Sequence, residues 1–241
     1  QEITSRFQQL RWRHRLDSGS EWALQFYYNH HESDEQVLTD PVAVPPLGTF
    51  RIPINYDVSS DRYQLEFQHS IPWERLRLVW GAGGREDQVK WPGFLGTPEM
   101  VDNFHYWLFL NLEWRMFEGW VLHAGAVAER HDITGNDVSP RLATTYQLAR
   151  GHTLRLGYST ATRTPTLIEE QSNARFCVTP TCTVYDQTFY SSGNLSPERI
   201  ESTELGYLGR LLPALTLDAR LFRDRISDLI GIYTVPYPDP L

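Results

Sequence analysis

Two groups of side chains carry metal-binding or redox-active atoms at short spacing. Cys177 and Cys182 are thiols five positions apart. In a loop on an oxidising cell surface we expect them to form a disulfide, whereas two thiols without further ligands nearby make a poor zinc site. His30 and His31 are followed by three carboxylates, a group that either binds a metal or lies at a solvated loop mouth. We interpret it as a solvated loop and predict no metal site.

A third group suits an anionic, aromatic ligand. Guanidinium groups form charge-assisted hydrogen bonds with anions and attract aromatic rings through cation–π contact. Aromatic side chains of a loop also pack on one another, so ligand binding and packing within the loop both stay open as interpretations. The candidate ligand-binding residues are Arg163, Arg175, Tyr185, Phe189 and Tyr190, which lie near Glu169 and Glu170, together with His30 and His31.

His131 and Asp132 form the pair that most resembles acid–base machinery. General-base catalysis needs a second carboxylate or a nucleophile within hydrogen-bonding reach, and no motif in the sequence supplies one. Asp224 and Asp228 qualify only by their expected position near the end of a strand. We therefore predict no catalytic residues and no enzyme activity, and keep a ten-stranded surface hydrolase as an alternative.

The elements that must position these side chains are β-strands. Apolar residues recur at every second position, which is the period of a strand with one apolar face. In 21–29, for example, Trp22, Leu24, Phe26 and Tyr28 share one face. This pattern predicts ten strands. They centre on 10–12, 22–28, 63–67, 76–80, 104–114, 120–126, 142–146, 154–158, 205–207 and 215–221.

The connections between these strands alternate in length. Alternation of this kind is typical of an all-β, antiparallel up-and-down transmembrane barrel with short periplasmic turns and long extracellular loops. A soluble sandwich would mix loop lengths and use Greek-key connections. The short turns are expected at Asp17–Ser20, Ser70–Trp73, Phe117–Gly119, Ala149–Gly151 and Leu211–Pro213, and the long loops at 30–60, 84–102, 129–138 and 163–198.

The aromatic residues agree with a membrane barrel. They make up 13% of the chain, with 8 Trp, although only 41% of residues are hydrophobic. Trp and Tyr gather at the two membrane interfaces of such a barrel. We assign Trp12, Trp22, Trp114, Trp120, Tyr146 and Tyr207 to the short-turn end, and Tyr28, Tyr63, Trp80, Phe104, Tyr106 and Tyr158 to the long-loop end.

Charge and hydropathy exclude two classes of protein, nucleic-acid binders and membrane proteins that span the bilayer with helices. The formal net charge is −8, so the clustered excess of Lys and Arg that a nucleic-acid binder needs is absent. No run approaches the ~18 apolar residues of a membrane helix, and the mean hydropathy is −0.43. The strand face opposite the apolar one is rich in charges, which would each cost ~2–4 kcal/mol at the centre of a bilayer. We expect that face to line a polar lumen.

Several motifs follow one another in the second half of the chain. They are Ser139–Ala143, Thr153–Ser159, Arg163–Leu167, Gly193–Glu198 and Glu201–Tyr207, followed by Leu221–Phe222 and by Ile226, Asp228, Leu229 and Ile230. This ordered series resembles the barrel of TonB-dependent outer-membrane receptors, and the remainder of the chain resembles it more loosely.

The resemblance implies a receptor in the outer membrane of a Gram-negative bacterium that takes up a scarce nutrient. Its partners would be outer-membrane lipid, a small-molecule metal chelate such as an iron–siderophore, and the TonB complex, which acts through a plug domain. Cobalamin, haem and sugars are other ligands of the family, but haem receptors carry a His between boxes like Arg163–Pro165 and Asn194–Leu195, and this interval has none. No cofactor is implied.

The chain departs from the plan of that family in size. The family barrel has 22 strands around an N-terminal plug, whereas this sequence shows ten strands, no plug and no energy-coupling box. We therefore interpret residues 1–241 as a partial receptor barrel with the plug domain absent. An independent ten-stranded barrel and a passive porin are the alternatives within the same fold.

Overall fold

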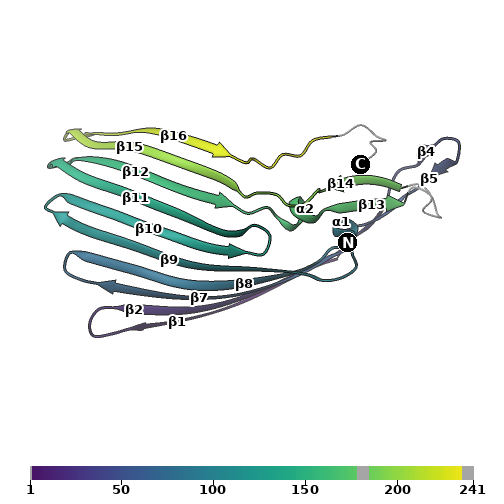
Figure 1. Cartoon of the computed structure of the whole chain (residues 1–241), viewed down its shortest axis with the longest axis horizontal. Helices are drawn as coiled ribbons and strands as arrows, with labels where there is room; N and C mark the ends of the chain where they lie inside the picture. The colour runs from purple at the N-terminus through teal and green to yellow at the C-terminus, as the bar shows by residue number, and fades with distance from the viewer. Residues whose placement is uncertain (1, 178–184, 235–241) are drawn as a thin grey trace.

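Ten long strands form one antiparallel sheet in the computed structural model, which describes residues 2–177 and 185–234 (Figure 1). Neighbours in the sheet are also successive long strands along the chain, so the sheet is a meander, as predicted. The strands are β1 (Glu2–Arg15), β2 (Glu21–Asp34), β7 (Val58–Pro72), β8 (Leu76–Lys90), β9 (Val101–Phe117), β10 (Trp120–His131), β11 (Gly135–Ala149), β12 (His152–Arg163), β15 (Glu198–Leu212) and β16 (Leu215–Ser227).

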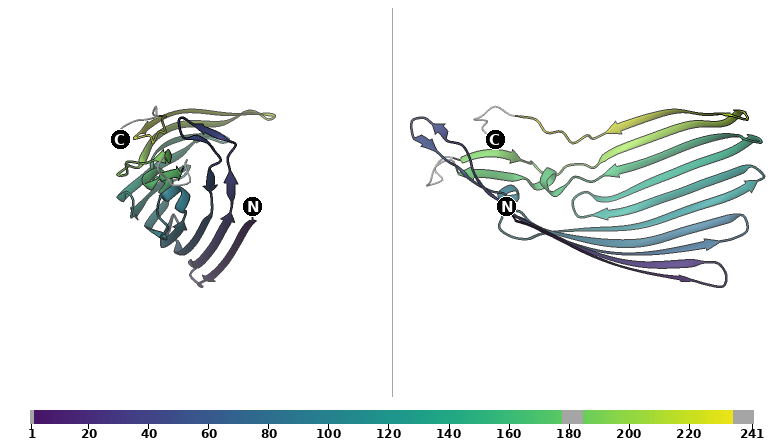
Figure 2. Two further views of the ribbon diagram at one scale, coloured as in Figure 1. Left: turned by 90° about the vertical axis from the view of Figure 1, so that its right-hand side faces the viewer. Right: turned by 180° about the vertical axis from the view of Figure 1, so that it is seen from behind.

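The sheet curves into an open trough and does not close on itself. Strands β1 and β16 are its two edges, and they lie on opposite sides of the opening in Figure 2. Unpaired edge groups are costly in lipid because the bilayer core offers no water to replace the missing hydrogen-bond partners. The curvature of the sheet is that of a barrel wall. Both free edges would need partner strands before the sheet could span a membrane.

The short turns all lie at one end of the sheet, and four of the five lie where the sequence predicts them (Figure 1). The turn predicted at Ser70–Trp73 is displaced, because β7 continues to Pro72 and the connection to β8 is 73–75. The predicted long loop at 129–138 is wrong, because β10 and β11 continue to a connection of only Asp132–Thr134. The strands are 12 to 17 residues long, longer than alternation of apolar residues alone indicates. Their outer ends are polar on both faces, so the apolar period fades there while the ladder of backbone hydrogen bonds continues.

The other long connections contain short elements of their own. Strand β3 (Gln36–Leu38) pairs with β6 (Pro53–Asn55), and β4 (Val42–Val44) pairs with β5 (Gly48–Phe50). Helix α1 (Pro92–Leu95) lies between β8 and β9. Helix α2 (Leu167–Gln171) follows β12 and precedes a hairpin of β13 (Asn173–Cys177) and β14 (Tyr185–Tyr190).

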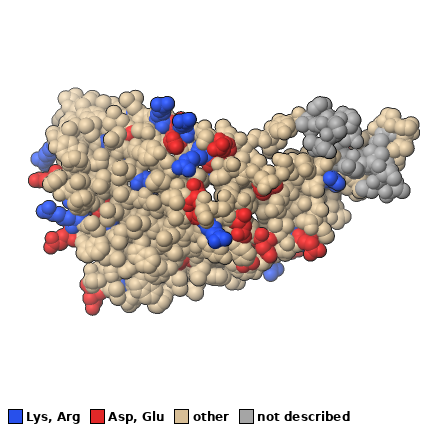
Figure 3. Space-filling model, in the orientation of Figure 1, with Lys and Arg blue, Asp and Glu red and all other residues tan. Residues whose placement is uncertain are grey.

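The convex face of the sheet carries an apolar band. Cross-strand neighbours share a face, and the register places Leu10 beside Phe26, Phe26 beside Leu65, and Leu110 beside Ala126 on this side. Leu110 is 49% exposed. Figure 3, which views the convex face, shows few charged side chains between the short-turn end and the long-loop end. The apolar face predicted from the sequence is confirmed, and its contact with lipid stays a prediction.

One aromatic assignment is wrong. Trp80 is the fifth residue of β8, whose outer end extends to Lys90, and its register neighbour on β9 is Leu110, so it lies inward of the long-loop aromatic group. Its register neighbour on β7 is His69, which in turn pairs with Trp22 of the short-turn group. The other end is marked by the stacked pair Tyr28 and Tyr63, with ring centroids 5.0 Å apart.

Buried apolar side chains are few, because a sheet one layer thick exposes both of its faces. Within 2–177 and 185–234 they are Ala23, Ile52, Leu95 and Ala174, and the last three lie in the long connections. The outer loops therefore have a small core of their own. None of the helices in these ranges has the length and apolar composition needed to cross a membrane.

Candidate functional site

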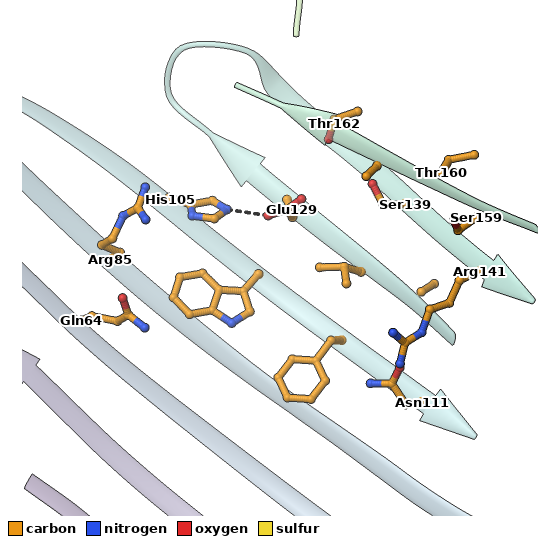
Figure 4. A pocket seen from close by; sticks show the side chains of 15 residues that line it. Gln64, Arg85, His105, Asn111, Glu129, Ser139, Arg141, Ser159, Thr160 and Thr162 are labelled. Atoms are coloured by element: carbon orange, nitrogen blue, oxygen red, sulfur yellow. Dashed lines mark hydrogen bonds and ion pairs between the residues drawn. The ribbon is translucent and has the colours of Figure 1, made fainter. Parts of the chain in front are cut away.

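The concave face of the sheet contains a hollow of about 640 Å³ at the level of strands β7 to β12 (Figure 4). Side chains from different strands converge on it because every second residue of each strand points to this side. Its lining includes Gln64, Arg85, His105, Trp107, Phe109, Asn111, Glu129, Ser139 and Arg141.

The wall of the hollow is built from two aromatic rings lying against two glycines. Gly83 and Trp107 are register neighbours, as are Gly81 and Phe109. A Cβ at Gly81 would lie 2.5 Å from Cζ of Phe109, and a Cβ at Gly83 would overlap the Trp107 ring. Only glycine leaves room for the rings to lie along the sheet. The result is an aromatic surface facing the lumen.

Charged groups surround this surface. Asp87 accepts a hydrogen bond from Nε of Arg62 at 2.5 Å and lies 2.9 Å from Nε of Arg85. It therefore forms ion pairs with two guanidinium groups. Arg141 donates to the neutral side-chain amide of Asn111, and no ion pair of Arg141 occurs within the described ranges. The charge of Arg141 is therefore the one in the hollow that is not balanced by a carboxylate.

His105 adds a polar contact on the outer side of the hollow. Its Nε2 lies 2.9 Å from Oε1 of Glu129, as Figure 4 shows, and its ring lies against Trp107 with centroids 5.0 Å apart. The ring of His131 is 5.2 Å away on the other side. These contacts hold His105 and Glu129 in fixed orientations at the rim of the aromatic surface.

The long connections pack together at the outer end through an aromatic cluster, which we call the loop cap: Tyr56, Trp91, Phe94 and Phe189. Phe94 is its centre, with ring centroids 4.4 Å from Trp91, 5.7 Å from Phe189 and 6.0 Å from Tyr56. These residues come from three different connections. The cap thus joins loops that are far apart in the sequence.

Arg163, predicted as a ligand contact, lies in an ion-pair network that we call the latch: Arg163, Glu169 and Glu198. Its Nε donates to Glu198 at 2.5 Å, and its two terminal nitrogens donate to Glu169 at 2.9 and 3.1 Å. Glu169 also forms a capping box with Thr166 at the start of α2. An anionic ligand would have to compete with two carboxylates for this guanidinium, so ligand binding by Arg163 stays a prediction.

The latch lies beyond the apolar band, and its charges act on each other. The guanidinium of Arg163 lowers the pKa of Glu169 below its ordinary value of 4.5 and lowers the pKa of Glu198 to about 2. Both carboxyl groups are therefore ionised at neutral pH. Glu198 also accepts from the backbone N of Ile230 at 2.9 Å, so the latch joins the ends of β12, β15 and β16.

The other predicted loop residues lie on the hairpin of β13 and β14. Arg175 is an exposed residue of β13. Phe189 and Tyr190 are 38% and 52% exposed at the end of β14, and Tyr185 begins that strand opposite Cys177. The exposure of Arg175, Phe189 and Tyr190 is compatible with a ligand role, and ligand binding by these residues and by Tyr185 stays a prediction.

The predicted disulfide partner of Cys177, Cys182, lies outside the described residues. Cys177 is the last residue of β13. The disulfide between them stays a prediction, checked by the mass shift on alkylation with and without reductant.

His30 and His31 are separated by the strand that carries them. His30 lies on the convex side, where its Nδ1 is 3.0 Å from Oδ1 of Asp61, which also accepts from the Tyr28 hydroxyl at 2.8 Å. His31 points to the opposite face, because successive residues of a strand alternate. In the described ranges no group of three or more His, Cys, Asp or Glu is arranged to hold a metal ion.

His131 is the last residue of β10, and Asp132 begins the short turn to β11. Asp132 accepts from the backbone N of Phe104 at 2.9 Å, and Nδ1 of His131 accepts from the backbone N of Ile133 at 3.3 Å. Asp224 lies on β16, with β11, β12 and β15 in between. The contacts of His131 and Asp132 are those of a turn closure.

The aromatic surface was not predicted from the sequence. One feature of the sequence could have predicted it. On the polar face of β8 and β9 the alternation of polar and apolar residues is interrupted, because Gly81 and Gly83 lie opposite Phe109 and Trp107. Large apolar residues on a lumen-facing parity, with glycine on the adjacent strand, indicate a ring packed along the wall.

Comparison with curated protein sequences gives no match. Among solved structures, a variant of the ferric enterobactin receptor from Pseudomonas aeruginosa has a TM-score of 0.70 at 17% identity, covering 93% of this chain and 35% of the receptor. The siderophore receptor PirA from Acinetobacter baumannii has a TM-score of 0.69 at 16% identity, with 93% and 35% covered. The chain therefore shares their fold and spans about a third of their length.

A family profile settles the relationship at the level of sequence. The profile described as TonB dependent receptor-like, beta-barrel matches residues 1–240, almost the whole chain. The ten-stranded meander, its apolar convex face and its polar lumen face agree with that assignment. This chain belongs to the TonB-dependent receptor β-barrel family.

Proposed function

We propose that the chain forms part of the barrel of a Gram-negative outer-membrane receptor that takes up an iron chelate of the siderophore class. The family, whose members are transport receptors, supports transport over catalysis. Uptake would be driven by the TonB complex acting through a plug domain. The outer-membrane lipid would contact the convex apolar band.

The observation that carries the ligand class is the aromatic surface of Trp107 and Phe109 with Arg141 beside it. Flat aromatic faces stack with aryl rings, and a guanidinium whose charge is not balanced attracts an anion. An iron chelate built from aryl oxygen ligands is planar in its arms and carries negative charge. The similar structures named above are those of siderophore receptors, which supports the same class.

Uptake of a radioactive iron chelate tests the proposal. The full protein encoded by the gene would be produced in a Gram-negative strain that lacks its own siderophore receptors, with and without TonB. We expect uptake of a catechol-type chelate that requires TonB and exceeds uptake of a hydroxamate chelate. Absence of uptake for every chelate, or uptake that persists without TonB, would refute it.

A matched pair of variants locates the site. Trp107→Ala removes one face of the aromatic surface, and we expect a three- to tenfold rise in the half-saturating chelate concentration, since an aromatic pair contributes ~0.5–1.5 kcal/mol. Tyr106→Ala, one residue away on the convex face, should leave that concentration unchanged. Equal effects of the two substitutions would place the site elsewhere.

Two simple measurements separate the alternatives of porin and hydrolase. A passive porin would show steady conductance in planar bilayers without TonB. A surface hydrolase would cleave peptides or lipids, with activity lost in His131→Ala or Asp132→Ala. We expect neither result. For the hydrolase the reason is that the side chains of His131 and Asp132 are engaged in closing a turn.

A further inference from the structure

The pairing between β11 and β12 stops before either strand ends. Their outermost register pair is Arg141 with Ser159. Beyond this pair β11 stays paired with β10, and β12 stays paired with β15, as far as the strands run. The outer segments 135–140 and 160–163 are therefore unpaired on the sides that face each other, and we call the space between them the wall gap. It lies inside the sheet, so it does not arise from the free edges at β1 and β16.

Pro140 explains why the pairing stops there. It is the register neighbour of Ala126, in a ladder with β10 that continues on both sides. A residue without an N–H fits this ladder when its backbone faces away from β10, and so toward β12. The register places Pro140 opposite Thr160. Because the backbone groups of an antiparallel strand point to its two neighbours in turn, those of Thr160 and Thr162 face the wall gap.

The hollow of the lumen face extends into the wall gap. All four residues 159–162 line it, whereas β9 contributes only every second residue. Successive residues of a strand point to opposite faces, so the hollow reaches between the strands here. Figure 4 shows Ser139 and Arg141 of β11 on the side of the hollow where β12 lies. Thr160 is only 7% exposed, and its Oγ1 has no hydrogen-bond partner among the described residues.

These groups suit a ligand with amide bonds. Buried backbone and hydroxyl groups are normally hydrogen-bonded, so unpaired ones in a hollow favour a polar ligand. A strand with an open side pairs with an extended peptide through the N–H and C=O groups of both chains. The aromatic surface and Arg141, which the proposed function assigns to the charged aryl arms of a chelate, line the same hollow.

We propose that the open side of β12 at 160–162 binds amide groups in the scaffold of the chelate. The receptor then prefers chelates whose aryl arms are joined by a peptide. This inference rests on the proposed function and names the class of chelate within it.

Two ferric chelates that differ only in their scaffold test the inference. Both carry three catechol arms on a short peptide, and in one of them every scaffold amide is N-methylated. The methyl group removes the donor and keeps the amide away from a strand edge, while the arms and the charge stay the same. Binding to the full protein in detergent is followed by quenching of tryptophan fluorescence. We expect the unmethylated chelate to bind about tenfold more tightly, the effect of roughly two hydrogen bonds.

A matched pair of variants at Thr162 locates the contact. Thr162→Pro removes the N–H that faces the wall gap, and its register partner Arg199 lies on the other side of the strand. Thr162→Val removes the hydroxyl and keeps the N–H. We expect Thr162→Pro to abolish the tenfold preference without changing binding of the N-methylated chelate, which also shows that the variant is folded. Thr162→Val should retain the preference.

Hydrogen exchange of 160–163 gives a measurement that needs no variant. Exchange should slow when the unmethylated chelate binds and stay unchanged with the N-methylated one. Equal exchange with the two chelates, equal affinity for them, or a preference that persists in a folded Thr162→Pro would overturn the inference. In each of these cases both chelates still bind, so the proposed function stands. Failure of both chelates to bind the original protein would refute the proposed function and this inference with it.

Discussion

Substitution of Leu110 by arginine tests which face of the sheet meets lipid. Leu110 lies on the convex face of β9, four residues from Trp114 on one side and four from Tyr106 on the other. At ~3.3 Å per residue and a tilt near 45°, each aromatic is ~9 Å away along the membrane normal. Leu110 is therefore at the middle of the apolar band.

The depth of Leu110 sets the size of the effect. An arginine at the middle of the lipid-facing side of a barrel costs ~2–4 kcal/mol, and the cost falls toward zero near the interfaces. We expect Leu110→Arg to lower the free energy of unfolding by that amount. His123→Arg is the matched control, because His123 is exposed on the lumen face and pairs in register with Glu113. It should change stability by less than ~0.5 kcal/mol.

The assay is denaturant unfolding of the full protein in phospholipid vesicles, followed by tryptophan fluorescence. Free energies are obtained by linear extrapolation to zero denaturant. A loss below ~1 kcal/mol for Leu110→Arg, or a loss of the same size for His123→Arg, contradicts the assignment of the convex face to lipid.

Two further predictions concern the lumen wall and the latch. Gly83→Val should push the Trp107 ring off the wall, which a shift in tryptophan fluorescence would report; an unchanged spectrum contradicts the packing described here. Glu169 and Glu198 have pKa values below 4.5 in the folded protein, so the stabilisation from the latch is complete above about pH 4.5 and is lost as pH falls toward 2. Hydrogen exchange of α2 should therefore speed up over that interval in addition to its normal pH dependence, and Arg163→Ala should give fast exchange already at neutral pH. An unaltered pH profile in Arg163→Ala argues against the latch.

Much of the fold follows from local pattern. A strand has a side-chain period of two, so one apolar face such as Trp22, Leu24, Phe26 and Tyr28 is visible in the sequence without knowledge of its neighbours. Short turns are equally local, because tight connections need glycine or polar residues at fixed places; Gly19 and Gly119 have φ values of +81° and +74°. Strand number and order, and the separation into two faces, were therefore predictable.

Strand length was less predictable, because beyond the lipid both faces of a strand are polar. The predicted loop at 129–138 is the clearest case, since Glu129 and Asp137 are paired residues of β10 and β11. A polar segment is a loop only where the backbone hydrogen bonds between two strands have ended. Whether they continue depends on the partner strand, which local sequence does not show. The assignment of Trp80 to the long-loop end was wrong for the same reason, because β8 continues ten residues beyond Trp80.

The candidate site shows the limit of sequence reasoning most directly. The predicted ligand residue Arg163 is matched by two carboxylates, one of them 35 positions away, and no local pattern announces that pairing. The aromatic surface depends on which residue of β8 stands opposite Trp107, and that is a matter of register. A shift of one residue would bring every side chain to the other face.

The sequence by itself thus determined a membrane-barrel meander with one apolar and one polar face, since alternation and turn chemistry act between residues close in the chain. The tertiary structure alone decided which distant side chains meet: those of the hollow with Arg141, of the loop cap around Phe94 and of the latch of Arg163. Those contacts join strands and loops distant in the chain, and the cross-strand register and the curvature of the sheet bring them together.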